Sequence, residues 1–127
     1  MVLFAINKRV DFMKETETLK KNYEFKNILN RGSYISARHL ECFFLKNKKN
    51  KNLIGIAISS KIAKAYQRNR IKRLVRQVYS EEEILLKKEF SMVFLCKKKS
   101  NIDEITYKTV KEDVQKIFKG MKIYLDD

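Results

Sequence analysis

KIAKAYQRNRIKRLVR, residues 61–76, is the stretch that best indicates the fold of the chain and the purpose of its positive charge. Seven of its sixteen residues are Lys or Arg, and none is Asp or Glu. At about 100° per residue, the apolar residues in and just after it form a single stripe. These residues are Ile71, Leu74, Val75, Val78 and Tyr79. The pattern predicts a helix from about residue 64 to 82 with one apolar face and one cationic face.

The positive charge is large and unevenly distributed. The 127 residues carry a formal net charge of +14, and residues 42–80 contain eleven Lys or Arg and no carboxylate. Such an excess repels itself unless a polyanion is near, which indicates a nucleic acid or an anionic membrane surface. Arg68, Lys72 and Arg76 recur about 6 Å apart along the helix axis, close to the spacing of phosphates on a strand. A merely solvated helix usually pairs Glu with Lys four residues apart, and this one has no acids, so nucleic-acid binding is favoured.

Composition excludes several other classes of protein. The chain is 44% apolar with eight Phe and six Tyr, which suits one domain with a modest core. Cys42 and Cys96 lie in apolar runs without metal-ligand spacing, so we expect buried thiols in a reducing cytoplasm. No apolar run approaches the roughly 18 residues of a membrane span, and MVLFAI at the start is a poor signal peptide. His39 is the single histidine, and we expect neither catalytic residues nor a metal site in the protein.

The remaining elements follow from periodicity and capping residues. We expect a poorly ordered arm over residues 1–18, one domain over 19–120 and a tail over 121–127. Within the domain, Asn22 and Gly32 bound a helix over 22–31, and Thr106 begins a last helix that ends near Gly120. Strands are expected at 33–46, 53–60 and 90–97, with a hairpin loop at 47–52. The small residues on one side of 53–60 leave room for a helix or a ligand. The order predicts an α+β two-layer sandwich, with a small mixed sheet and three helices.

RNA is favoured over DNA as the polyanion. No tight helix–turn–helix precedes the basic helix, because a strand does. A sheet with aromatic side chains can stack unpaired bases, and Phe25 and Phe43 are candidates, although a core role explains each equally well. A ribosomal-type structural RNA-binding protein and a DNA-binding regulator remain alternatives at this point.

Three segments together resemble the bacterial ribonuclease P protein subunit. GIAISSKIAKAYQRNRIKRLVRQVY (55–79) is similar to the family's signature, a Gly-led strand, Ser-x-Lys and then Arg-Asn-Arg-x-Lys-Arg on a helix. LKKNYEFKNILNRGSYISARHLECFF (19–44) resembles its opening helix and first strand, and ITYKTVKEDVQKIF (105–118) its final helix. The resemblance covers about residues 19–120 in order.

The resemblance implies a function. The family's protein assists a large catalytic RNA, one protein to one RNA, and the complex removes the 5′ leader from precursor tRNA. The RNA performs the chemistry with Mg²⁺, and neither a membrane nor an obligate protein partner is implied. A cleft between the first helix and the sheet, with Phe25, Phe43 and the near edge of the basic helix, would bind the single-stranded leader. The RNA-binding residues expected on this basis are Lys61, Lys64, Arg68, Asn69, Arg70, Lys72, Arg73 and Arg76.

The sequence also departs from the family pattern. Ser60, Lys61 and Ala63 stand where the family often has two lysines and a glycine, and Leu29 where it often has an aromatic residue. Family members typically begin near Met13, so residues 1–12 are expected to be a dispensable arm or a start-site artefact. The family's sheet has four strands where the pattern above gives three, and the resemblance therefore adds the alternative that the long 33–46 run is broken. Its left-handed strand–helix–strand crossover is an exception to the usual right-handed rule, and the residues alone do not decide the hand.

Overall fold

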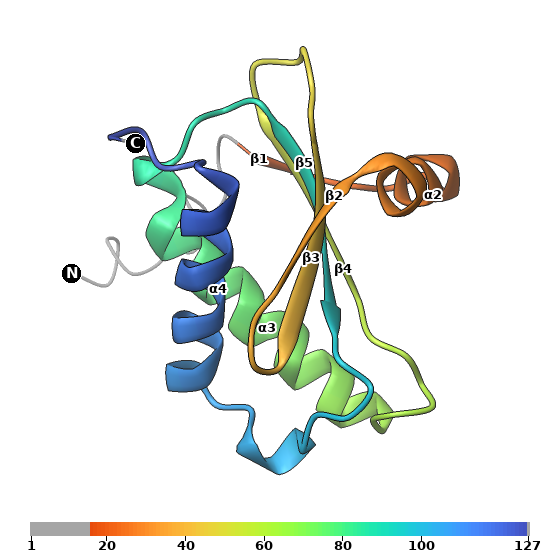
Figure 1. Cartoon of the computed structure of the whole chain (residues 1–127). Coiled ribbons are helices and arrows are strands. Elements are labelled where there is room, and N and C mark those ends of the chain that lie inside the picture. Colours follow the sequence, from red (N-terminus) through yellow and green to blue (C-terminus); the bar gives the residue numbers. More distant parts are fainter. Residues whose placement is uncertain (1–15, 127) are drawn as a thin grey trace, which may run out of the picture.

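Five strands form one mixed sheet in the order β1-β4-β5-β3-β2 within residues 16–126, the part of the chain that the computed structural model describes (Figure 1). β1 and β5 run parallel to β4, whereas β3 is antiparallel to both β5 and β2. The strands are β1 (Thr16–Thr18), β2 (Ser33–Ser36), β3 (Leu40–Lys46), β4 (Asn52–Ala57) and β5 (Phe90–Cys96).

Helices cover both faces of this sheet. The helices are α2 (Asn22–Arg31), α3 (Ala65–Glu82) and α4 (Tyr107–Met121), with short 3-10 turns η1 (Glu83–Leu85) and η2 (Ile102–Glu104). Figure 1 shows α3 and α4 together on one side of the sheet and α2 on the other. The predicted α+β class, with a small mixed sheet and three helices, is therefore confirmed. β4 and β5 are parallel neighbours joined through α3, and the hand of this crossover stays a prediction.

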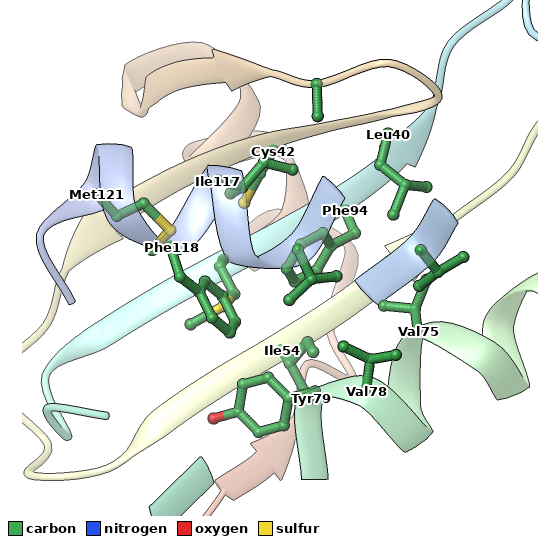
Figure 2. Close-up of a cluster of buried hydrophobic side chains, with 14 of the residues drawn as sticks. Leu40, Cys42, Ile54, Val75, Val78, Tyr79, Phe94, Ile117, Phe118 and Met121 are labelled. Atoms are coloured by element: carbon green, nitrogen blue, oxygen red, sulfur yellow. The ribbon is translucent and has the colours of Figure 1, made fainter. Parts of the chain in front are cut away.

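The main core lies between the sheet and the α3–α4 pair. Because side chains alternate along a strand, every second residue of β3, β4 and β5 points to this side. The Phe118 ring of α4 lies 6.0 Å from that of Tyr79 on α3 and 6.1 Å from that of Phe94 on β5, in edge-to-face contacts. Figure 2 shows the cluster, which includes Leu40, Cys42, Ile54, Val75, Val78, Tyr79, Phe94, Ile117, Phe118 and Met121. This burial fixes which face of α3 remains in solvent.

A smaller cluster lies under α2 on the opposite face. Leu19, Ile28, Leu53 and Val93 are buried there. A Cβ placed on Gly55 of β4 would lie 2.6 Å from Cε1 and Cζ of the Phe25 ring, so only glycine admits this approach. The small-residue side of the predicted 53–60 strand thus accommodates a helix, one of the two occupants expected.

The predicted strand over residues 33–46 is wrong as a single element, because it is a hairpin of β2 and β3. Asp113 of α4 holds the turn between them by accepting three backbone N–H groups. The donors are Arg38 (3.3 Å), His39 (2.8 Å) and Leu40 (3.1 Å). A contact some 75 residues away in sequence therefore bends a segment whose alternating pattern favours one strand.

The predicted hairpin at residues 47–52 is also wrong, because β5 lies between β3 and β4 and pairs with both. β5 is buried on both faces along nearly its whole length, which suits the centre of the sheet better than an edge. β4 begins at Asn52 and ends at Ala57, three residues before the predicted end of that strand.

The helix bounds agree closely with the predictions. α2 begins at Asn22, although its N-cap is Lys21, and Gly32 caps its other end by donating to the Ile28 carbonyl (2.8 Å). Thr106 caps α4 as expected, since its hydroxyl accepts from the Thr109 N–H.

Both predicted terminal segments contribute to the fold where the structure describes them. Thr16–Thr18 of the expected arm form β1, and the Thr16 hydroxyl lies 2.7 Å from the Tyr79 hydroxyl. In the expected tail, Ile123 is buried and Tyr124 bridges to Leu86. The prediction for residues 1–12 lies outside the described residues.

Candidate nucleic-acid interface

α3 presents most of the predicted RNA-binding residues to solvent because its apolar stripe is buried. Ile71, Val75, Val78 and Tyr79 face the core. Asn69, Arg70, Arg73 and Arg76 are exposed, and Arg68 and Lys72 are half-buried. The helix thus keeps its cationic side chains rigidly spaced and on its outer surface.

The structure separates Arg70 from the other cations of the helix. Its guanidinium Nη2 donates to the Ile105 carbonyl oxygen (2.5 Å), just before α4. Eleven residues further along the same flank, Glu81 accepts from the Tyr107 hydroxyl (2.5 Å), which raises the pKa of Tyr107. Arg70 therefore lies on the flank that faces α4 and ties the two helices together.

The opposite flank carries what we call the cationic ridge, Arg68, Lys72 and Arg76. At 100° per residue, Arg68 projects about 200° away from Arg70, and Lys72 and Arg76 follow it one turn apart. Arg68 Nη1 donates to the Ala63 carbonyl oxygen (2.9 Å), which supports the turn before the helix; within residues 16–126 the other Arg68 donors remain available. Asn69 and Arg73 lie between the two flanks, on the side directly opposite the core.

Lys61 and Lys64 precede α3 and are exposed. The Lys61 N–H donates to Ser59 Oγ (3.1 Å), and the Lys64 N–H donates to Gln67 Oε1 (2.8 Å). Ala63, at the position where the family often has glycine, is buried, and no residue of this connection has a positive φ. The turn therefore does not require glycine.

Sequence reasoning missed two exposed tyrosines. Tyr66, in the first turn of α3, is 67% exposed and lies three and seven residues before Asn69 and Arg73, on the same side of the helix. This spacing was a visible signal. Tyr34 of β2 is 49% exposed, and its ring lies 4.9 Å from that of Phe43.

Phe25 and Phe43 lie on the same face of the sheet, as predicted, and both pack against the smaller cluster. Their surroundings differ, because the Phe25 ring covers Gly55 whereas Phe43 pairs with the exposed Tyr34. This is the α2 side of the sheet, and α3 lies on the other side (Figure 1). The sheet thus separates the aromatic pair from most of the basic helix, and residues 58–64 connect the two sides.

Within residues 16–126, no three or more His, Cys, Asp or Glu side chains are grouped so that they could hold a metal ion. Over the same residues, no helix has the length and apolar character needed to cross a membrane. Burial raises the pKa of the Cys42 and Cys96 thiols, which are both free. These cysteines are buried as expected and are poor nucleophiles.

Fold and surface together define a basic α+β protein with two features suited to RNA. One is a cationic helix, and the other, on the opposite side of the sheet, is an aromatic pair of exposed Tyr34 and half-buried Phe43. Comparison with known proteins identifies one family. The family model described as Ribonuclease P matches residues 13–122. The ribonuclease P protein component of Fusobacterium nucleatum is 38% identical over 108 residues, which cover 84% of this chain and 97% of that protein. The one from Bacillus pumilus is 34% identical over 113 residues, covering 88% and 93%.

Solved structures agree with these sequence relatives. The ribonuclease P protein from Thermotoga maritima matches with a TM-score of 0.74 and 26% identity, over 82% of this chain and 96% of that one. The protein from Staphylococcus aureus shares the fold, with a TM-score of 0.75 and 21% identity over 84% and 96% of the two chains. The chain belongs to the ribonuclease P protein component family, whose members are subunits of a tRNA-processing endoribonuclease.

Proposed function

We propose that this chain binds the catalytic RNA of ribonuclease P through the outer surface of α3 and binds the single-stranded leader of precursor tRNA on the α2 side of the sheet. The observation that carries the proposal is the placement of cations and aromatics on opposite sides of one sheet. Rigidly spaced cations suit a folded RNA backbone, whereas exposed rings suit unpaired bases.

The surface for the catalytic RNA is the cationic ridge with Asn69 and Arg73, extended by Lys61 and Lys64. Arg70 contributes its remaining donors from the α4-facing flank. Each guanidinium can bind a phosphate through two parallel hydrogen bonds, which a lysine cannot do. One protein binds one RNA, and the RNA supplies the chemistry together with Mg²⁺ that the holoenzyme binds. The complex acts in the cytoplasm.

The surface for the leader includes Phe43 rather than Phe25 as the main stacking residue. Phe43 forms a pair with the exposed Tyr34, whereas the edge of the Phe25 ring packs against Gly55. A base that stacks on an aromatic side chain contributes about 1–3 kcal/mol.

A reconstitution experiment tests the proposed function. The purified chain mixed with the catalytic RNA should increase precursor-tRNA cleavage at low Mg²⁺, and no effect on either affinity or rate would refute the proposal. Co-sedimentation with ribosomal particles, without preference for leader-bearing tRNA, would instead support a ribosomal-type protein. Tight binding to duplex DNA that survives moderate salt would support a DNA-binding regulator.

A second experiment tests the leader surface. Phe43→Leu keeps an apolar side chain over the smaller cluster but removes the ring. We expect this variant to lose affinity for precursor tRNA by roughly tenfold while its affinity for mature tRNA is unchanged. Equal losses for both RNAs would show that Phe43 is only a packing residue.

A further inference from the structure

A carboxylate lies beside the Tyr34–Phe43 pair on the side of the sheet that we assign to the leader. Glu41 of β3 is half-buried and pairs across the sheet with Ser36 of β2 on one side and Leu95 of β5 on the other. Because side chains two residues apart share a face, Glu41 lies on the same side as Phe43. Tyr34 is on this side too, since it pairs with Phe43 in the β2–β3 register.

Glu41, Tyr34 and Phe43 form one connected group. The Tyr34 hydroxyl donates to Glu41 Oε2 (2.6 Å), and the Tyr34 ring lies 4.9 Å from the Phe43 ring at an interplanar angle of 51°. This hydrogen bond raises the pKa of Tyr34, and the protonated hydroxyl orients the carboxylate. Within residues 16–126, the second carboxylate oxygen, Oε1, keeps its acceptor capacity.

The charge of Glu41 is unfavourable for general RNA binding. The chain has a formal net charge of +14, and a carboxylate on its RNA-binding side repels the phosphates that the lysines attract. The ion pairs Arg38–Glu104, Lys46–Glu89, Lys49–Glu24 and Lys51–Glu17 do not include Glu41. A glutamine could accept the same hydrogen bond from Tyr34, so the link between β2 and β3 does not require a charge.

We propose that Tyr34 and Glu41 form a base-reading site for one leader nucleotide that bears an exocyclic amino group. This inference rests on the proposed function. The base stacks on the exposed Tyr34 ring beside half-buried Phe43, and Glu41 Oε1 accepts a hydrogen bond from the amino group. A carboxylate can only accept, so it favours adenine, cytosine and guanine over uracil, whose single N–H lies between two carbonyl oxygens. The negative charge of Glu41 also repels phosphates, so a base edge rather than the sugar–phosphate backbone approaches this carboxylate.

The test is a competition between precursor tRNAs whose leader nucleotides are varied one at a time, cleaved by the reconstituted holoenzyme. At one leader position, the wild-type protein should give kcat/KM roughly tenfold higher for amino-bearing bases than for uracil. Glu41→Gln should reduce this ratio to within about twofold, because the glutamine amide can also donate to uracil O4. The variant should also bind oligouridine more tightly than the wild type does, since it repels phosphates less.

Glu112→Gln is the matched control, because it changes net charge equally at an exposed position on α4. It should leave the tenfold preference unchanged, and thermal unfolding should show that both variants are folded. A wild-type protein without base preference, or a Glu41→Gln variant that keeps it, would overturn the inference while leaving the proposed function in place. No stimulation of cleavage by the wild-type protein would refute the proposed function, and the inference with it.

Discussion

Arg70 and Arg73 are three residues apart on α3 but should respond to mutation in different ways. Arg73 is exposed and, among residues 16–126, has neither a hydrogen bond nor an ion pair. Arg73→Ala should therefore leave the free energy of unfolding unchanged while weakening binding to the catalytic RNA. Arg70→Ala also removes the hydrogen bond to the buried Ile105 carbonyl. That loss should cost about 1 kcal/mol of stability, or about 4 °C in Tm.

The magnitude for RNA binding follows from counterion release. One lost phosphate contact reduces the slope of log K against log salt by about 0.9 units for a duplex and about 0.7 for a single strand. When salt rises from 50 to 200 mM, the affinity of both proteins for RNA falls. A slope smaller by 0.9 units means that the factor by which it falls is about 3.5 times smaller for Arg73→Ala than for the wild type. A titration by fluorescence anisotropy at four salt concentrations, with a thermal melt of each variant, resolves both effects. Lys116→Ala, on the exposed face of α4, serves as the control for charge.

Two results would refute this reasoning. An Arg73→Ala variant with the wild-type salt slope would show that the side of α3 opposite the core does not meet RNA. An Arg70→Ala variant with unchanged Tm would show that its contact with Ile105 does not hold α3 to the start of α4.

Three further predictions concern the scaffold and are all measured by equilibrium or thermal unfolding. Asp113→Ala leaves the backbone N–H groups of the β2–β3 turn without their acceptor and should cost about 3 kcal/mol or more; a loss under 1 kcal/mol would mean that the turn holds itself. Gly55→Val places side-chain atoms where the Phe25 ring lies and should cost about 1–3 kcal/mol, whereas unchanged stability would mean that α2 shifts freely. Burial raises the pKa of Tyr79 to about 12, so about 2–3 kcal/mol of stability, fully present below pH 10, should be lost as pH rises towards 12. Tyr79→Phe should lack that loss, and a wild-type protein equally stable at pH 10 and 12 would contradict it.

Local patterns predicted the helices well, because their signals lie within the segments themselves. The buried stripe of α3 repeats at helical spacing, and Thr106 supplies the N-cap of α4. The family resemblance is confirmed as well, since the family model matches residues 13–122, which include all three similar segments. The prediction that exposed cations gather on α3 also needed nothing beyond helix periodicity.

The sheet was harder to predict because its pairing depends on distant residues. Read as one continuous strand, residues 33–46 place Tyr34 and Phe43 on opposite faces, since their numbers differ by an odd value. The turn held by Asp113 reverses the chain, and Tyr34 then pairs directly with Phe43. The Tyr34–Phe43 pair could not be predicted from alternation alone. The same holds for β5, which inserts between β3 and β4 from more than thirty residues further along the chain.

The separation of the two candidate surfaces bears on how one small protein could bind two RNAs. The cationic ridge and the Tyr34–Phe43 pair lie on opposite sides of a single sheet, so one RNA helix bound to α3 does not cover the aromatic pair. The chain joins α3 to the sheet at both ends of the helix: residues 58–64, with Lys61, lead in from β4, and residues 83–89 lead out to β5, which pairs with β3. Mutations on the two sides should then act nearly independently, since sites that share no partners have additive effects. Strict additivity of Arg73→Ala and Phe43→Leu in precursor cleavage would support two separate RNA contacts, and strong coupling would indicate that one RNA spans both.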